Sequence, residues 1–313
     1  MPVDVELEAD FAGMVRLPGG VFTMGSDLHY PEEKPAHKVR VHPFRIDRYA
    51  VTNRQFAAFV AATGHVTAAE TPADPADYPG ADPALLVPSS VVLVPPRGVV
   101  DKGNLHNWWR YVAGADWRHP RGPGSSLAGL DEHPVVHIAF ADAQAYARWT
   151  GKELPTEAEW EYASKGGNDD AEFAWGDELV PGGRYMANTW QGEFPWENLQ
   201  LDGYGFTAPV GSFPANGYGL YDMIGNVWEW TIDWYQEHAR IEKTCCTLDN
   251  PRGGEQNASI DPGDAARIAR RVTKGGSYAC APSYCRRYRP AARMAQPVDT
   301  STGHVGFRCV VRE

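Results

Sequence analysis

The sequence predicts an α+β fold: a single loop-rich domain over residues 1–313, with little regular secondary structure. Two observations lead to this class. The chain contains 32 glycines and 25 prolines, well above their usual combined share of roughly 12%. Aromatic residues reach 12%, with 11 tryptophans, and an apolar fraction of 43% is enough for a core. This composition favours short elements joined by long loops and packed through aromatic rings, rather than a helical bundle.

The charge and the termini exclude several classes of protein. Nucleic-acid binding needs a basic face, whereas the formal net charge is −11. The N-terminal segment MPVDVELEADFAGMVRLPGG is acidic and does not resemble a signal peptide. No apolar run approaches the roughly 18 residues of a membrane helix. We therefore expect a cytoplasmic monomer with no nucleic-acid or membrane partner, in which the five cysteines stay reduced.

The first third of the chain is predicted to contain a hairpin, a helix and a long irregular segment. MVRLPGGVFTMGSD, residues 14–27, alternates around a Pro-Gly-Gly turn and predicts a β-hairpin. VTNRQFAAFVAATG predicts a helix that ends at Gly64, because Thr52 and Gln55 have the spacing of a capping box. Residues 66–105 are rich in proline and predict an irregular surface segment.

A buried strand and two helices are predicted next. HPVVHIAF, residues 133–140, reads as a buried strand. ADAQAYARWTG predicts a short helix that Asp142 caps and Gly151 ends. LPTEAEWEYASKGG predicts a further helix, in which Thr156 and Glu159 form a capping box and two glycines end the helix. The remaining chain has only short apolar runs, so its buried backbone groups need other partners, and bound cations could supply them.

Two histidines have a spacing that occurs in metal sites. His133 and His137 are four residues apart, which places two ligands on one face of a helix. The intervening Pro-Val-Val favours a strand instead. We therefore expect these histidines to pack in the core rather than bind a metal.

Two cysteines lie close together in KGGSYACAPSYCRRYRPAAR. Pro282 argues against a continuous helix, and in a loop Cys280 and Cys285 can bring both sulfurs to one point. Zinc would want four ligands, and no further ligand lies at zinc spacing. Two thiolates suit a soft ion of low coordination, above all Cu(I), and neighbouring arginines would favour thiolates. From the residues alone, inert thiols, a redox pair and a soft-metal site remain open.

The same run, followed by HVGFRC, resembles the active-site segment of formylglycine-generating enzymes, the sulfatase-modifying factor family. Further matches occur in the same order along nearly the whole chain: LPGGVFTMGSD, GADWRHPRGPGSS, HPVVHIAFADAQAYARWTGKELPTEAEWEYASKGG, NTWQGEFP and APVGSFPANGYGLYDMIGNVWEW. LPTEAEWE and GNVWEW are shared by the wider superfamily, whereas two cysteines at C-x4-C spacing are specific to the formylglycine branch. The resemblance implies the formylglycine-generating-enzyme/C-type-lectin-like fold.

The resemblance also implies an activity. The family oxidises a cysteine in a C-x-P-x-R motif of an unfolded sulfatase to Cα-formylglycine, using O2 and a thiol reductant. It implies that Cys280 and Cys285 are the two Cu(I) ligands. Two thiolates leave room at the metal for the substrate thiolate.

Five further residues are candidates for the active site. Ser277 and Tyr284 match family positions that line the oxygen-side pocket, where their hydroxyls would orient O2 or water. Trp228 and Arg308 match motif positions at the substrate side, although packing explains them equally well. Asp116 is our candidate partner for the substrate arginine.

The resemblance further implies two structural Ca2+ sites in loops. Calcium takes six to eight oxygen ligands, and backbone carbonyls are among them, so the side chain at a ligand position need not matter. The first set of matching positions is Asn188, Thr189, Asp202 and Tyr204. The second set is Asp222, Gly225, Val227 and Glu229.

Some positions depart from the family pattern. AQPVDTS at 295–301 and His304 replace residues that are often Asn-Thr-Pro-Asp-Ser-Ser and Asn, which could alter the substrate groove. Cys309 occupies a position that is disulfide-bonded in secreted relatives, and the sequence offers it no partner. Cys245 and Cys246 form a vicinal pair that we interpret as bystander thiols rather than a copper-delivery or redox relay.

Two alternative functions use the same scaffold. An iron-dependent sulfoxide synthase would need a histidine-rich iron site and usually an extra helical domain, neither of which the sequence indicates. A non-catalytic binding module of lectin-like architecture would have no use for two cysteines in one loop.

Overall fold

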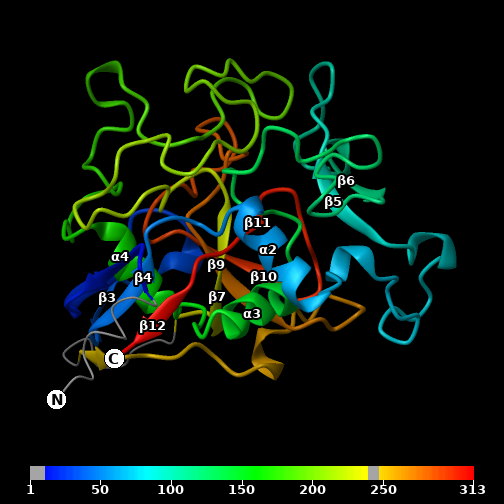
Figure 1. Cartoon of the computed structure of the whole chain (residues 1–313). Helices are drawn as coiled ribbons and strands as arrows, with labels where there is room; N and C mark the ends of the chain where they lie inside the picture. The colour runs from blue at the N-terminus through cyan, green and yellow to red at the C-terminus, as the bar shows by residue number, and fades with distance from the viewer. Residues whose placement is uncertain (1–10, 239–246) are drawn as a thin grey trace.

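The computed structural model describes residues 11–238 and 247–313. A four-stranded sheet, with strand order β10-β9-β7-β11, lies at the centre of the fold (Figure 1). Its strands are β7 (Trp228–Trp234), β9 (Arg270–Lys274), β10 (Arg293–Pro297) and β11 (Val305–Gly306). β7, β9 and β10 are antiparallel neighbours, whereas β11 runs parallel to β7. The segment that carries Cys280 and Cys285 connects β9 to β10.

The N-terminal segment does not form the predicted hairpin. β1 (Met14–Leu17) pairs with β4 (Phe44–Asp47), which also pairs with β12 (Val310–Arg312). β2 (Gly20–Met24) pairs instead with β3 (His37–Val41), and β8 (Leu248–Asp249) extends that sheet. The turn between β1 and β2 packs on the end of β3: a Cβ at Gly19 would lie 2.5 Å from the carbonyl oxygen of Val41. This contact directs the two strands into different sheets, so the hairpin prediction was wrong.

The three predicted helices are present, and the caps of two of them are as the sequence indicates, whereas the third has Ala139 rather than Asp142 as its N-cap and Thr150 as its C-cap. α2 (Asn53–Thr63) has a capping box between Thr52 and Gln55. α4 (Glu157–Lys165) has one between Thr156 and Glu159. Both helices end at a glycine in the left-handed region. α3 (Phe140–Trp149) begins slightly earlier than predicted, and the Asp142 carboxylate accepts a hydrogen bond from the Ala139 amide at 3.0 Å.

Residues 133–140 are buried but are not a strand, so that prediction was also wrong. The chain makes one bridge, between Pro134 and Thr52, and then turns because His137 has φ of +61°. The proline-rich segment is more ordered than predicted: β5 (Ser89–Leu93) pairs with β6 (Trp109–Ala113). The short 3-10 turns are η1 (Pro31–Glu33), η2 (Ala68–Glu70), η3 (Pro83–Leu85), η4 (Leu105–Asn107), η5 (Pro181–Gly183) and η6 (Asn257–Ser259).

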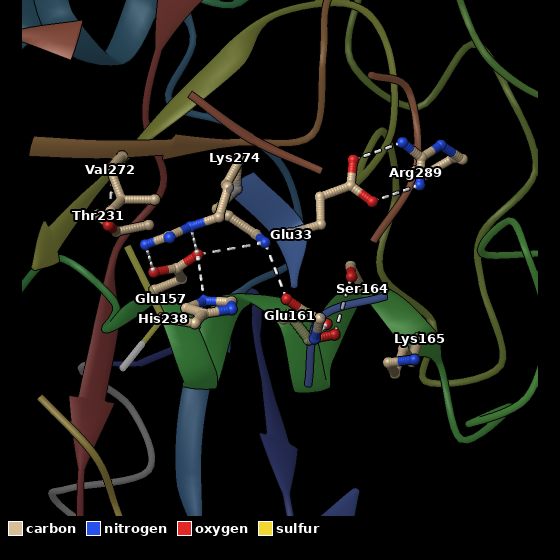
Figure 2. Close-up of polar contacts among 12 residues, drawn as sticks. Glu33, Glu157, Glu161, Ser164, Lys165, Thr231, His238, Val272, Lys274 and Arg289 are labelled. Atoms are coloured by element: carbon tan, nitrogen blue, oxygen red, sulfur yellow. Dashed lines mark hydrogen bonds and ion pairs between the residues drawn. The ribbon is translucent and has the colours of Figure 1, made fainter. Parts of the chain in front are cut away.

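The core combines aromatic rings with buried ion pairs. Four tryptophans are fully buried: Trp108, Trp160, Trp228 and Trp230. All nine residues of α4 are buried, and its carboxylates meet cations from the central sheet (Figure 2). Glu161 lies 2.8 Å from Lys274, and Glu157 accepts two hydrogen bonds of 2.7 Å from Arg293. These pairings offset part of the desolvation cost of the charges on α4. None of the helices in the described part of the chain has the length and apolar character that a membrane span requires.

Candidate active site

The cysteine loop, residues 275–292, is fixed at its start by two glycines. Gly275 and Gly276 both have positive φ, at +97° and +72°. A Cβ at Gly276 would lie 2.7 Å from the carbonyl oxygen of Arg287, so the two ends of the loop approach more closely than other residues would allow. β9 and β10 are paired neighbours, which brings the start and the end of the loop together on the central sheet.

Two backbone turns bring the sulfurs together. The Cys280 amide donates to the Ser277 carbonyl at 2.9 Å, and the Cys285 amide donates to the Ala281 carbonyl at 2.8 Å. The two Sγ atoms lie 3.5 Å apart, and both cysteines are free thiols. Cys280 is 3% exposed, whereas Cys285 is only partly buried. The pair therefore has one sulfur in the core and one facing the surface.

The two thiols have unlike electrostatic surroundings. A hydrogen bond from Cys280 lowers the pKa of Cys285 to about 6, and the positive charge of Arg287 acts in the same direction. Arg287 Nη1 lies 3.7 Å from Cys285 Sγ. The pKa of Cys280 is raised, first by its hydrogen bond to Cys285 and then by burial. The surroundings of Cys285 therefore favour its thiolate, the form of a cysteine that binds a soft cation.

Aromatic side chains pack around Tyr284, the residue that precedes Cys285. Tyr284, which is 38% exposed, stacks on Phe194 with ring centroids 4.8 Å apart. Trp108 packs edge-on against both rings, at 5.6 Å from each. Ser277 is fully buried, and its Oγ accepts a hydrogen bond of 3.3 Å from the Ala279 amide. The predicted hydroxyl residues thus lie at the two ends of the segment that holds the sulfurs.

The first candidate cation loop contains an unpartnered buried oxygen. Asn188 is 1% exposed, and its Oδ1 atom has no hydrogen-bond partner among residues 11–238 and 247–313. Its Nδ2 atom donates to the Phe206 carbonyl at 2.7 Å, which fixes the direction of the side chain. Asp202 accepts from the amides of Thr189 and Tyr204, both at 3.0 Å, and burial raises its pKa. A buried amide oxygen and a half-buried carboxylate are two oxygens of the kind that Ca2+ binds.

The second candidate loop holds two carboxylates beside one arginine. Asp222 has φ of +53°, and burial raises its pKa to about 6. Its Oδ2 accepts a hydrogen bond of 2.7 Å from the Gly211 amide. Glu229 accepts from Arg308 at 2.7 and 2.8 Å and from Trp160 Nε1 at 2.8 Å. The Glu229 carboxylate is thus already paired, whereas Asp222 forms no ion pair within the part of the chain that the structure describes.

Both cation loops are hydrogen-bonded to the cysteine loop and to each other. The Gly225 amide donates to the Gly275 carbonyl at 2.9 Å, and the Tyr278 amide donates to the Asn226 carbonyl at 3.0 Å. The Trp190 amide donates to the Cys280 carbonyl at 2.9 Å. The Asn226 amide also bonds the Asn188 carbonyl at 2.8 Å, which joins the two cation loops. A conformational change in either loop would therefore shift the backbone that positions Cys280.

The three proposed substrate residues have local partners. Trp228 is 2% exposed and packs in the cluster that includes Cys280. Arg308 is fully buried, and protein oxygens accept from all three of its nitrogens. Asp116 accepts from the amides of Arg118 and His119, at 2.6 and 2.9 Å, which closes its own turn.

His137 packs in the core as predicted, whereas His133 is only half-buried. His137 is fully buried between Ser90 Oγ, at 2.7 Å, and the Pro120 carbonyl, at 2.9 Å, and burial lowers its pKa to about 4. His133 bonds Thr207 Oγ1 at 3.0 Å. Over residues 11–238 and 247–313, no three His, Cys, Asp or Glu side chains converge as a metal-binding group. Cys309 is a buried free thiol, whereas Cys245 and Cys246 lie outside the described residues.

The sequence did not identify the segment that supports the exposed cysteine. Glu32 and Glu33, some 250 residues earlier in the chain, pair with Arg287 and Arg289. The basic run after Cys285 was visible in the sequence, but its partners were not, because nothing local pairs distant residues. Phe194 and Trp108 were missed for the same reason.

The fold and the paired cysteines define the class of protein. The family model described as "Sulfatase-modifying factor enzyme 1-like domain" matches residues 3–313. A Mycobacterium tuberculosis protein named formylglycine-generating enzyme is 53% identical over 299 residues, with 95% of this chain and 97% of the relative covered. A Streptomyces coelicolor protein of the same name is 48% identical, with coverages of 95% and 88%. The solved structure of PvdO from Pseudomonas aeruginosa matches with a TM-score of 0.64 and 25% identity, covering 96% of this chain and 94% of PvdO.

These likenesses show the family. The chain belongs to the formylglycine-generating enzyme family, in its bacterial form. The expected loop-rich α+β fold is confirmed.

Proposed function

We propose that this protein converts a cysteine in a C-x-P-x-R motif of an unfolded sulfatase to Cα-formylglycine, with Cu(I), O2 and a thiol reductant. The observation that carries the proposal is the pair of free sulfurs 3.5 Å apart, one buried and one reaching the surface. The family membership and the names of the relatives support the reaction. We further propose that the protein acts as a monomer in the cytoplasm.

The donor set suits the metal. Two sulfurs without other ligands favour a soft ion of low coordination, which fits Cu(I) better than zinc or calcium. Cys280 and Cys285 would hold this ion, which when bound would supply a site for the substrate thiol and for O2. The protein's own part is to keep the sulfurs close. The turns that end at the two cysteine amides do this before any metal arrives.

The surroundings of the sulfurs can orient a substrate and exclude water. Tyr284, Phe194 and Trp108 form an aromatic wall at the residue that precedes Cys285. Such a wall limits access of water while the Tyr284 hydroxyl remains free to orient a small polar molecule. Holding the reacting cysteine against this wall supplies the proximity that well-oriented reactions use, worth up to roughly 7–11 kcal/mol. Ser277 would hold the backbone of Cys280 and, in our proposal, line the oxygen side.

The proposed calcium sites would stabilise the loops around the reaction site. The unpartnered Oδ1 of Asn188 fits the first site, together with Asp202 and the carbonyls of Thr189 and Tyr204. Asp222 fits the second, with the carbonyls of Gly225 and Val227 and, through its remaining lone pairs, Glu229. Because both loops bond the cysteine loop, Ca2+ would act structurally rather than in the chemistry.

Three residues remain our candidates for contact with the substrate. Asp116 keeps a partly exposed carboxylate, at 14% of its side chain, that could also meet the arginine of the motif. Trp228 and Arg308 are buried and would act by shaping the floor of the site rather than by touching the peptide. Charge reversal of Asp116 to lysine should raise KM for the peptide if the arginine binds there.

The test is the conversion of a peptide that contains C-x-P-x-R. We expect the copper-loaded protein to produce an aldehyde that a hydrazide traps and mass spectrometry detects. Cys280→Ser and Cys285→Ser should abolish conversion while circular dichroism and melting temperature stay close to wild type. Wild-type turnover in both serine variants would refute the assignment. A protein that binds the peptide but never yields aldehyde would instead be a binding module.

A further inference from the structure

A segment near the N-terminus packs against the exit of the cysteine loop. Glu33, which is fully buried, accepts from Arg289 at 2.5 and 2.8 Å. Tyr30 Oη accepts a hydrogen bond of 3.0 Å from the Arg286 amide. Buried charge pairs with two hydrogen bonds are geometrically strict. The contact therefore fixes residues 30–33 against the chain that immediately follows Cys285.

This contact aims a single guanidinium group at Cys285. Nε and Nη2 of Arg287 both donate to Glu32 Oε1, at 2.9 and 2.6 Å. The guanidinium carbon lies 4.0 Å from the centroid of the Tyr30 ring. With two nitrogens and one face engaged, the third nitrogen, Nη1, is left 3.7 Å from Cys285 Sγ. A planar guanidinium held in this way has little freedom to turn elsewhere.

The charge of a copper–thiolate complex explains how Arg287 could assist metal binding. Two thiolates with one Cu(I) carry a net charge of −1, so a neighbouring cation stabilises the complex. A donor N–H toward sulfur also holds that atom in one position. Arg287 is 27% exposed and Glu32 20% exposed, so solvent screens this interaction only partly. Arg286 carries the same charge and lies one residue closer to Cys285 in the sequence. Its side chain, however, pairs with Glu172 at 3.0 Å.

We propose that Arg287, aimed by Glu32 and Tyr30, is a positioning residue that holds Cys285 Sγ toward Cys280 and strengthens metal binding by the pair. The inference rests on the proposed function, since it assumes that the pair binds Cu(I). It adds that the N-terminal segment belongs to the metal-binding machinery. It also predicts that the charge of Arg287 matters and that of Arg286 does not.

The test compares two variants that lose the same charge at adjacent positions. Cu(I) affinity is measured without oxygen, by competition with a chromogenic Cu(I) chelator at one fixed pH. Arg287→Gln should weaken Cu(I) binding by about tenfold, the size of one charge-assisted hydrogen bond. Arg286→Gln should stay within about twofold of wild type, because its charge is exposed and aimed away.

Two further variants separate positioning from folding. Arg287→Lys keeps the charge but cannot bind Glu32 and reach the sulfur at once, so it should restore part of the affinity that Arg287→Gln loses. Glu32→Gln should weaken Cu(I) binding by about threefold. In the double variant, Glu32→Gln should add nothing to Arg287→Gln, because its effect acts through Arg287.

The outcomes distinguish the two proposals. A wild-type protein that takes up no Cu(I) refutes the proposed function and with it this inference. Wild-type uptake with equal affinity in Arg287→Gln refutes the inference alone. Equal losses of Cu(I) affinity in Arg287→Gln and Arg286→Gln would also overturn the inference. They would show that the net charge of the protein matters, rather than the position of Arg287. Melting temperatures of all variants within about 3 °C of wild type exclude a general folding defect.

Discussion

At the residue scale, the two cysteines are alike in sequence and unlike in setting. Cys280 lies in the core and has a raised pKa, while Cys285 is partly exposed and lies beside Arg287. The sequence could show the pair and its spacing. It could not show the difference in burial, because that depends on Trp190, Phe194 and the N-terminal segment, which are distant in the chain.

The hydroxyl of Tyr284 provides a prediction at this scale. Tyr284→Phe keeps the ring stack on Phe194, so stability and Cu(I) uptake should stay within about 0.5 kcal/mol of wild type. Aldehyde formation should fall by about tenfold or more if the hydroxyl orients a reacting molecule. The measurement is kcat with saturating peptide and copper. Unchanged kcat would remove Tyr284 from the reaction and leave it as a wall residue.

Ser277 should behave differently. Its Oγ accepts from the Ala279 amide inside a buried turn, so Ser277→Ala should cost about 1 kcal/mol of unfolding free energy as well as turnover. Denaturant unfolding and turnover are measured on the same preparation. Loss of stability with full turnover would show that Ser277 only supports the loop.

At the element scale, the sequence patterns that mark helix ends were reliable, whereas those that suggest strands and strand pairing were not. The helices, and the caps of α2 and α4, were predictable, because a capping box and a terminal glycine act within a few residues. The hairpin predicted at residues 14–27 was wrong, because the turn glycine is needed for contact with the end of β3. The buried segment at 133–140 had a strand's composition, yet His137 turns the chain to reach Ser90 and Pro120.

Helix α4 gives a prediction about pH. Arg293, His238 and Lys274 outweigh the effect of burial and hold the pKa of Glu157 well below its ordinary value of 4.5. A depressed pKa means that the ionised carboxylate stabilises the folded state above about pH 4.5, and that this contribution is lost as the pH falls below it. Glu157→Gln should therefore lower the unfolding free energy by about 3 kcal/mol at pH 7, since it leaves buried cations unpaired.

The measurement is the melting temperature of wild type and variant from pH 7 to pH 3. The difference in melting temperature between wild type and Glu157→Gln should become smaller as the pH is lowered. Glu153→Gln is the control, because this glutamate is 56% exposed and pairs with Arg312 at the surface. A difference between wild type and Glu157→Gln that does not change with pH would contradict the ion-pair explanation.

At the scale of the whole molecule, four loops from distant parts of the chain meet at one place. The segment around residue 188 bonds the segments around residues 202 and 225. The segments around 188 and 225 also bond the cysteine loop, and the N-terminal segment pairs with the exit of that loop. Regular elements alone do not hold this arrangement. The sequence indicated that something other than strand ladders was needed there, but composition could not say which oxygens converge.

Calcium removal tests this arrangement. Dialysis against a calcium chelator should lower the melting temperature by roughly 5 °C relative to protein with excess Ca2+, and added Ca2+ should restore it. Asn188→Ala should remove part of this response, because the unpartnered Oδ1 is lost. Mg2+ should restore little, because it demands a tighter octahedral site. A melting temperature that changes neither with the chelator nor with added Ca2+ would refute the two structural calcium sites.

The most direct measurement of the central claim is a Cu(I) titration coupled to peptide turnover. We predict uptake of one Cu(I) per chain, none in the Cys280→Ser/Cys285→Ser double variant, and aldehyde formation that rises in proportion to the copper bound. Absence of copper uptake by the wild-type protein, together with aldehyde formation in copper-free buffer, would contradict the account.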